Sequence, residues 1–96
     1  MSKKRFLSVW DAIEDTPEQA ENMKLRSIVM RALKNRIVKL KLTQERAAKL
    51  LGVTQPRVSD LMRGKINLFA LDVLVNMAAS AGLHVVMQIR KIDKAA

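Results

Sequence analysis

The chain has no cysteine, a single histidine and only three aromatic residues among its 96 residues. The absence of cysteine excludes a disulfide framework and a cysteine-ligated metal site. No nucleophile–base set, glycine-rich phosphate loop or metal-ligand cluster accompanies the single histidine, His84. We therefore expect no enzyme, no cofactor and no bound metal. No apolar run is long enough to span a bilayer, and the apolar stretch at residues 6–10 is too short for a signal peptide.

Acidic residues are concentrated in one short segment. Residues 11–21 carry five acids and no base, whereas residues 24–65 carry twelve bases and only two acids, Glu45 and Asp60. The net charge is +9. This separation predicts two surfaces with two partners, a nucleic acid for the basic segment and a basic protein for the acidic one. For the acidic segment, simple solvation is an equally good explanation.

Residues 43–63 have the pattern of a helix-turn-helix. Thr43 and Thr54 are suited to cap two short helices, about 44–51 and 55–62, and Gly52 can supply the positive φ at the end of the first. A compact helical pair without any DNA function would show the same apolar spacing. The outward row of the second helix nevertheless suits a major groove. The positions expected to face inward are Ala47, Leu51, Val53, Val58 and Leu61, and the outward row is Gln55, Pro56, Arg57, Ser59, Asp60 and Arg63.

Two further helices and a strand are predicted outside this motif. Thr16-Pro17 begins a helix that runs to about residue 40, with a weak point at Asn22 and an apolar stripe that includes Ile28 and Leu33. Another helix is expected over residues 68–81. After Gly82 the helical spacing of the apolar residues gives way to a repeat of two residues, which predicts a β-strand.

A single strand needs a partner, and the chain offers no second good candidate. We expect this strand to pair with its counterpart in a second copy, so that a homodimer forms. Pairing with the N-terminal arm and packing on the helices are the alternatives. The expected organisation is an N-terminal arm (1–15), a helical domain (16–82), a dimerisation strand (83–91) and a tail (92–96). The dimer residues would be Leu83, Val85, Met87 and Ile89.

The outward residues suggest specific contacts with DNA. A glutamine at position 55 can bond to adenine, and Arg57 can form a forked pair with guanine or equally reach a phosphate. Ser59 can bond to either a base or a phosphate. Asp60 can accept from cytosine N4 or hold Arg57 or Arg63 in place, and we favour the second because a free carboxylate would be repelled by phosphates. The residues expected to contact the DNA backbone are Gln44, Thr54, Arg63, Lys65 and Asn67.

The N-terminal arm holds two of the three aromatic residues. Phe6 and Trp10 stand beside the acids Asp11 and Glu14. A tryptophan next to acids suits a basic protein partner. The alternative is that Trp10 folds back onto the domain's own core.

These segments together resemble a known family. The helix-turn-helix is similar to the Xre (Cro-type) DNA-binding domains, and the longer pattern resembles the short HigA-like antitoxins, over about residues 8 to 91. The segments that carry the resemblance are Ser8-Val9-Trp10-Asp11, Lys24-Leu25-Arg26, Leu42-Thr43-Gln44, residues 50–61 (LLGVTQPRVSDL) and Gly82-Leu83-His84-Val85. One departure is Lys41-Leu42, where many relatives have a glycine before the motif.

The resemblance implies an all-α, lambda-repressor-like helix-turn-helix bundle, here with a short C-terminal β-strand that pairs across a dimer. It also implies a bacterial, cytoplasmic and nucleoid-associated repressor that binds its own operator and neutralises a small basic RelE/HigB-like toxin. On this basis Gln55, Arg57 and Ser59 contact bases. The arm residues Phe6, Trp10, Asp11 and Glu14 are the expected toxin contacts. A free-standing Xre-type regulator without a toxin partner is the alternative.

Overall fold

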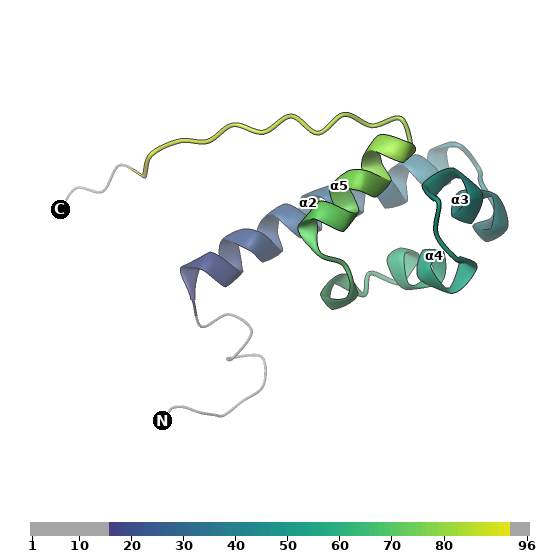
Figure 1. Ribbon diagram of the computed structural model, residues 1–96, viewed down its shortest axis with the longest axis horizontal. Coiled ribbons are helices and arrows are strands. Elements are labelled where there is room, and N and C mark those ends of the chain that lie inside the picture. Colours follow the sequence, from purple (N-terminus) through teal and green to yellow (C-terminus); the bar gives the residue numbers. More distant parts are fainter. Residues whose placement is uncertain (1–15, 93–96) are drawn as a thin grey trace, which may run out of the picture.

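The computed structural model describes residues 16–92 of the chain, and the expected toxin contacts Phe6, Trp10, Asp11 and Glu14 lie outside this range. Within it the chain forms four α-helices and one short 3-10 helix (Figure 1). In chain order these are α2 (Pro17–Lys39), α3 (Gln44–Leu51), α4 (Gln55–Met62), η1 (Ile66–Leu68) and α5 (Leu71–Ser80).

The long helix α2 begins where the sequence predicts. The Thr16 hydroxyl accepts a hydrogen bond from the Gln19 backbone N–H at 3.0 Å, and Pro17 occupies the first helical position. The helix then continues to Lys39 with no break at Asn22. No helix in residues 16–92 is long and apolar enough to cross a membrane.

The buried face of α2 differs from the predicted stripe. Val29, Met30, Leu33 and Ile37 are buried, whereas Ile28 is 54% exposed. These positions follow the i, i+3, i+4 spacing of one helix face. Because α2 has apolar residues on more than one side, its periodicity did not identify which side meets the other helices.

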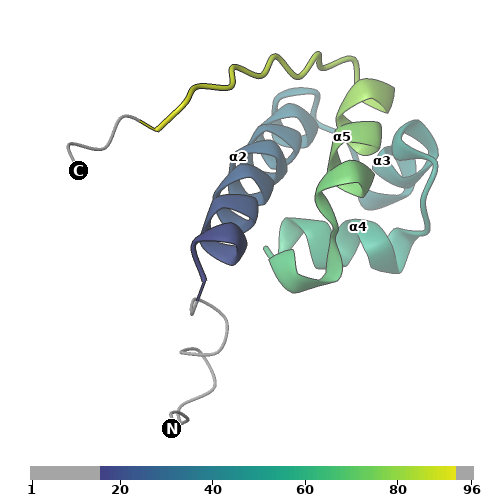
Figure 2. The ribbon, with the colours of Figure 1, turned by 60° about the vertical axis from the view of Figure 1, so that its left-hand side comes forward.

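The core lies between α2 and the three helices that follow it. Figures 1 and 2 both show α5 beside α2, and Figure 2 shows α3 and α4 across α5 from α2. All of the largest side chains with no exposure come from α2, α4, α5 and the segment between η1 and α5. They are Phe69, Leu33, Leu61, Leu74 and Val58.

The helix-turn-helix is formed as the sequence predicts. Thr43 and Thr54 accept hydrogen bonds from the backbone N–H groups of Arg46 and Arg57, at 3.1 and 3.3 Å. Gly52 ends α3 with a φ of 70°, a conformation that costs an L-residue about 1–2 kcal/mol. Each of these features depends on groups within about four residues, which explains why the sequence alone indicates them.

The turn before the motif contains the one departure from the family pattern. Lys41 has a φ of 56°, the only positive φ of a non-glycine residue in the described chain. The left-handed conformation therefore occurs in the Lys41-Leu42 linker, the place where the resemblance leads us to expect a glycine. Lysine has a steric cost in this conformation that glycine avoids.

The last helix starts later than predicted. Instead of a helix from residue 68, the chain forms η1 and then a short extended link, and α5 begins at Leu71 with Ala70 as its N-cap. This link carries Phe69, which is completely buried. A helix beginning at residue 68 would have followed local propensity, but burial of the Phe69 ring stabilises the interrupted path.

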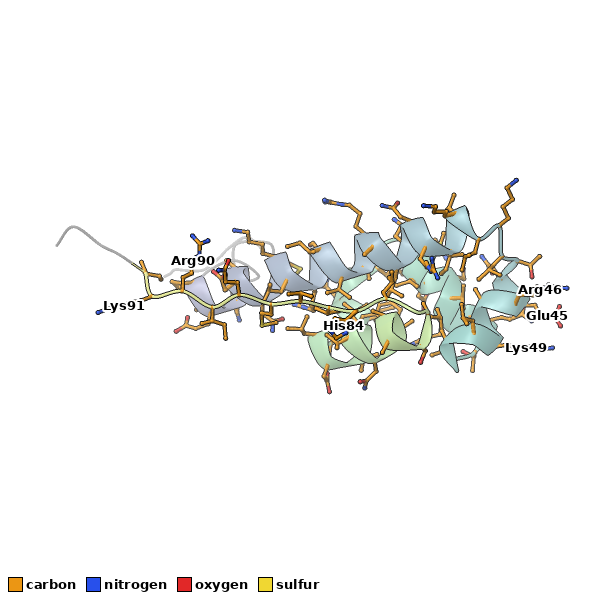
Figure 3. All side chains as sticks on the ribbon, turned by 90° about the horizontal axis from the view of Figure 1, so that it is seen from above. Glu45, Arg46, Lys49, His84, Arg90 and Lys91 are labelled. Carbon is orange, nitrogen blue, oxygen red and sulfur yellow. The ribbon has the colours of Figure 1, made fainter. Side chains whose placement is uncertain are left out.

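The predicted C-terminal β-strand is wrong: residues 83–92 form no strand in the described chain and run as an extended segment away from α5 (Figure 1). The alternation of side chains is real, but no other described segment supplies a ladder of hydrogen bonds. Leu83 and Val85 instead pack against the helical core, which was one of the alternatives. Figure 3 shows Arg90 and Lys91 at the end of the molecule opposite Glu45, Arg46 and Lys49 of α3.

Candidate nucleic-acid interface

The predicted base contacts all belong to α4 but leave it in different directions. An α-helix turns about 100° per residue, so Gln55 and Ser59 lie on one side, and Arg57 lies about 160° around the helix from each of them. Val58 and Leu61 are buried and define the core side of α4. Gln55 is exposed, whereas Arg57 and Ser59 are partly buried.

Arg57 rests on an aromatic ring. Its guanidinium carbon lies 4.2 Å from the centroid of the Phe69 ring, within the distance of a cation–π interaction. Among the described residues no group accepts a hydrogen bond from this guanidinium. The charged end of Arg57 is thus held by its flat face, and its N–H groups remain available to a ligand.

Asp60 is paired with a residue other than those expected. Its Oδ1 atom lies 3.7 Å from the Lys65 Nζ atom, whereas the sequence suggests Arg57 or Arg63 as partner. The Lys65 backbone N–H also donates to the Asp60 carbonyl at 3.1 Å, which brings the two residues together at the end of α4. The physical reason is local: Gly64 has a positive φ of 74° and turns the chain back after α4, which brings Lys65 beside Asp60.

The predicted backbone contacts are all exposed to solvent and lie at the ends of short elements. Gln44 begins α3, Thr54 caps α4, Arg63 follows α4 and Asn67 lies in η1. Helix N-termini present free N–H groups, which suit phosphate oxygens. Of this set, Thr54 is already engaged, because its hydroxyl oxygen accepts from the Arg57 N–H.

Two residues of this region contribute to the site although the sequence does not indicate it. Phe69 stands out only as an aromatic residue, and Arg26 only as part of a family pattern. The Arg26 guanidinium donates to the carbonyls of Ile66 and Phe69, at 3.3 and 3.4 Å. It thereby ties α2 to the segment that carries the ring. These partners are 40 and 43 residues away in sequence, so no local pattern could have revealed them.

Comparisons with known proteins agree with this geometry. Residues 12–90 match the family described as helix-turn-helix domain. A solved structure described as an XRE family transcriptional regulator is 30% identical, with a TM-score of 0.71 over 80% of this chain and 86% of that chain. The chain belongs to the XRE family of helix-turn-helix transcriptional regulators. No curated protein sequence matches it.

The XRE family consists of DNA-binding regulators, and the chain is therefore assigned to that class. The exposed polar residues of the α3–α4 pair are consistent with DNA binding. In such a motif the second helix enters the major groove with its N-terminal residues at the base edges. In this chain that helix is α4, and its first residue is Gln55.

Proposed function

We propose that this XRE-family regulator is a sequence-specific repressor in which α4 contacts bases through Gln55, Arg57 and Ser59. The observation that carries the proposal is the arrangement of α4: a capped N-terminus with an exposed glutamine, and an arginine whose guanidinium N–H groups have no hydrogen-bond partner among the described residues. Glutamine suits adenine and a forked arginine suits guanine.

The backbone contacts complete this proposal. Gln44, Thr54, Arg63, Lys65 and Asn67 flank α4 from the start of α3 to η1 and would set the register on phosphates. The high proportion of bases over residues 24–65 supports a strong, salt-dependent attraction to DNA.

Binding-site selection from randomised duplex DNA tests the proposal. The wild-type chain should enrich one sequence, and Gln55→Ala should lose about 1–3 kcal/mol on that sequence and relax one base position. Gln88→Ala is the matched control, because Gln88 is an exposed glutamine in the C-terminal segment. An unchanged base profile for Gln55→Ala would exclude the proposed docking of α4.

We also propose that the chain binds DNA as a homodimer, since helix-turn-helix dimers commonly occupy two half-sites one helical turn apart. Of the four predicted dimer residues, Met87 and Ile89 are exposed, whereas Leu83 and Val85 lie against the chain's own core. Light scattering of the free protein and the stoichiometry on the selected DNA test this. A monomer in both measurements would contradict it.

We propose further that this regulator acts as the antitoxin of a toxin–antitoxin pair. This role is supported by the resemblance of the motif segments and by the acidic residues at positions 11–21, which complement a basic toxin. Under this proposal, deletion of residues 1–15 abolishes neutralisation and spares DNA binding. A truncated chain that still neutralised would refute the assignment of toxin contacts to the arm.

The alternative is a free-standing regulator without a toxin. Purification of the tagged chain from its native host in high salt separates the two possibilities, because salt removes nonspecific nucleic acid and leaves a well-packed protein interface. A stoichiometric small basic protein would support the antitoxin role. A homodimer without any other protein would favour the free-standing regulator.

A further inference from the structure

Phe69 is a buried neighbour of Arg57, one of the residues proposed to contact bases. It has no exposed surface, lies outside the helix-turn-helix and is separated from Arg57 by twelve positions in the chain. Its ring nevertheless lies directly under the Arg57 guanidinium, at 4.2 Å. The contact is therefore created by the tertiary fold and joins the core to the proposed base-contacting helix.

Several contacts within the chain fix the position of the Phe69 ring. The Phe69 backbone N–H donates to the Ile66 carbonyl at 3.1 Å, and the Phe69 carbonyl accepts from Arg26 of α2. The side chain itself belongs to the core cluster formed with α2, α4 and α5. Because these contacts fix the position of the ring, it can act as a rigid support for the flexible side chain of Arg57.

Guanidinium groups have two separate recognition surfaces. The flat face interacts with an aromatic ring, while all five N–H donors point outward in the plane and can form a forked pair with guanine. A guanidinium stacked on Phe69 therefore keeps its whole donor edge. Stacking also restricts the rotamers of Arg57 in the free protein, so that less conformational entropy is lost when the forked pair forms.

We propose that Phe69 is a specificity-determining residue, which holds the Arg57 fork in the orientation needed to select guanine. The inference rests on the proposed function, because it requires that Arg57 contact a base. It extends that function to a buried residue that never touches DNA. The backbone contact from Arg26 has a supporting role, since it fixes the segment on which the ring is carried.

The sharpest test changes the ring's charge distribution and leaves its shape nearly unchanged. Replacement of Phe69 by pentafluorophenylalanine removes the negative potential of the ring face, on which the cation–π attraction depends. Binding-site selection should then show a roughly twofold to fivefold loss of discrimination at one base position. All other positions and the salt slope should stay as in the wild-type protein.

Four further variants complete the experiment. Arg57→Ala identifies the base position that Arg57 selects, and Arg57→Lys keeps the positive charge but removes the fork. Phe69→Leu retains an apolar core residue, and thermal unfolding monitors its stability. In the Arg57→Ala background, the fluorinated ring should have no further effect on the base profile.

Each contrary result has a distinct meaning. A wild-type profile for the fluorinated protein, together with a lost position in Arg57→Ala, would overturn the role of Phe69 and leave the proposed function intact. A change in salt slope without a change in base profile would also overturn it, because Arg57 would then be a phosphate contact. An unchanged profile in Arg57→Ala would refute the base contact itself, and the role of Phe69 with it.

Discussion

The Lys65 ammonium lies 3.7 Å from the Asp60 carboxylate at the end of α4. Both side chains keep access to solvent, 44% for Lys65 and 29% for Asp60. The pair therefore contributes little to stability, in the range of exposed ion pairs. Its importance lies in its position, since it sets a negative charge beside a residue expected to contact phosphate.

Asp60→Asn should bind every DNA sequence more tightly, roughly twofold to fivefold, because it removes a repulsive charge and releases Lys65. Lys65→Ala should weaken all sequences about alike and lower the salt slope by about one. Fluorescence anisotropy over a range of NaCl concentrations measures both effects. Asp72→Asn, an exposed aspartate on α5, is the matched control. Weaker binding of one sequence by Asp60→Asn would indicate that Asp60 accepts from a cytosine instead.

Thr54 combines a structural and a proposed binding function, which two substitutions should separate. Thr54→Val removes the cap of α4 and should cost about 1 kcal/mol of unfolding free energy. Thr54→Asp keeps an oxygen to accept from the Arg57 N–H, so stability should be retained, while its charge should weaken DNA binding through repulsion of phosphates. Chemical denaturation and anisotropy give the two readouts. Undiminished affinity in Thr54→Asp would remove Thr54 from the predicted phosphate contacts.

Replacement of Lys41 by glycine should stabilise the protein. A left-handed φ costs an L-residue about 1–2 kcal/mol, of which the greater chain entropy of glycine offsets about half. We therefore expect Lys41→Gly to gain about 0.5–1 kcal/mol in thermal or urea unfolding. Lys24→Gly, at an exposed lysine inside α2, should instead lose about 1 kcal/mol. A loss in both variants would show that the turn tolerates the lysine without strain.

Arg36 joins the two longest helices. Its Nε–H donates to the Ala81 carbonyl at 3.0 Å, at the end of α5. Arg36→Ala should cost about 1.5–3 kcal/mol, because a hydrogen bond from a charged group is lost. Arg31→Ala, on the exposed side of α2, should have little effect. Equal losses in denaturant titrations of the two variants would indicate that helix packing, and not this bond, holds α5 in place.

Local interactions explain the parts of the fold that were predicted correctly. The caps at Thr16, Thr43 and Thr54 and the left-handed Gly52 involve groups within a few residues of each other. Residue types with strong conformational preferences occupy each of these positions. The bounds of α3 and α4, and with them the helix-turn-helix, therefore follow from short stretches of sequence.

Two of the predictions that were wrong, the C-terminal strand and the start of α5, concern competition between distant segments. The alternation at residues 83–89 is typical of a strand, yet a strand requires a second segment to bond with, and Leu83 packs on the helices instead. Similarly, α5 starts later than expected because Phe69 occupies a buried position. The conformational preference of a short stretch of sequence contains no information about the long-range contacts that favour a different structure.

By itself, then, the sequence determined where the helix-turn-helix lies and that its surroundings are basic, because capping geometry and charge are properties of neighbouring residues. Only the tertiary structure decided that Arg57 stacks on Phe69, that Lys65 pairs with Asp60, and which side of α2 is buried. The stacking and the buried side of α2 depend on how helices pack, and the ion pair depends on how the chain turns after α4. Packing selects one arrangement among several that the local pattern permits equally.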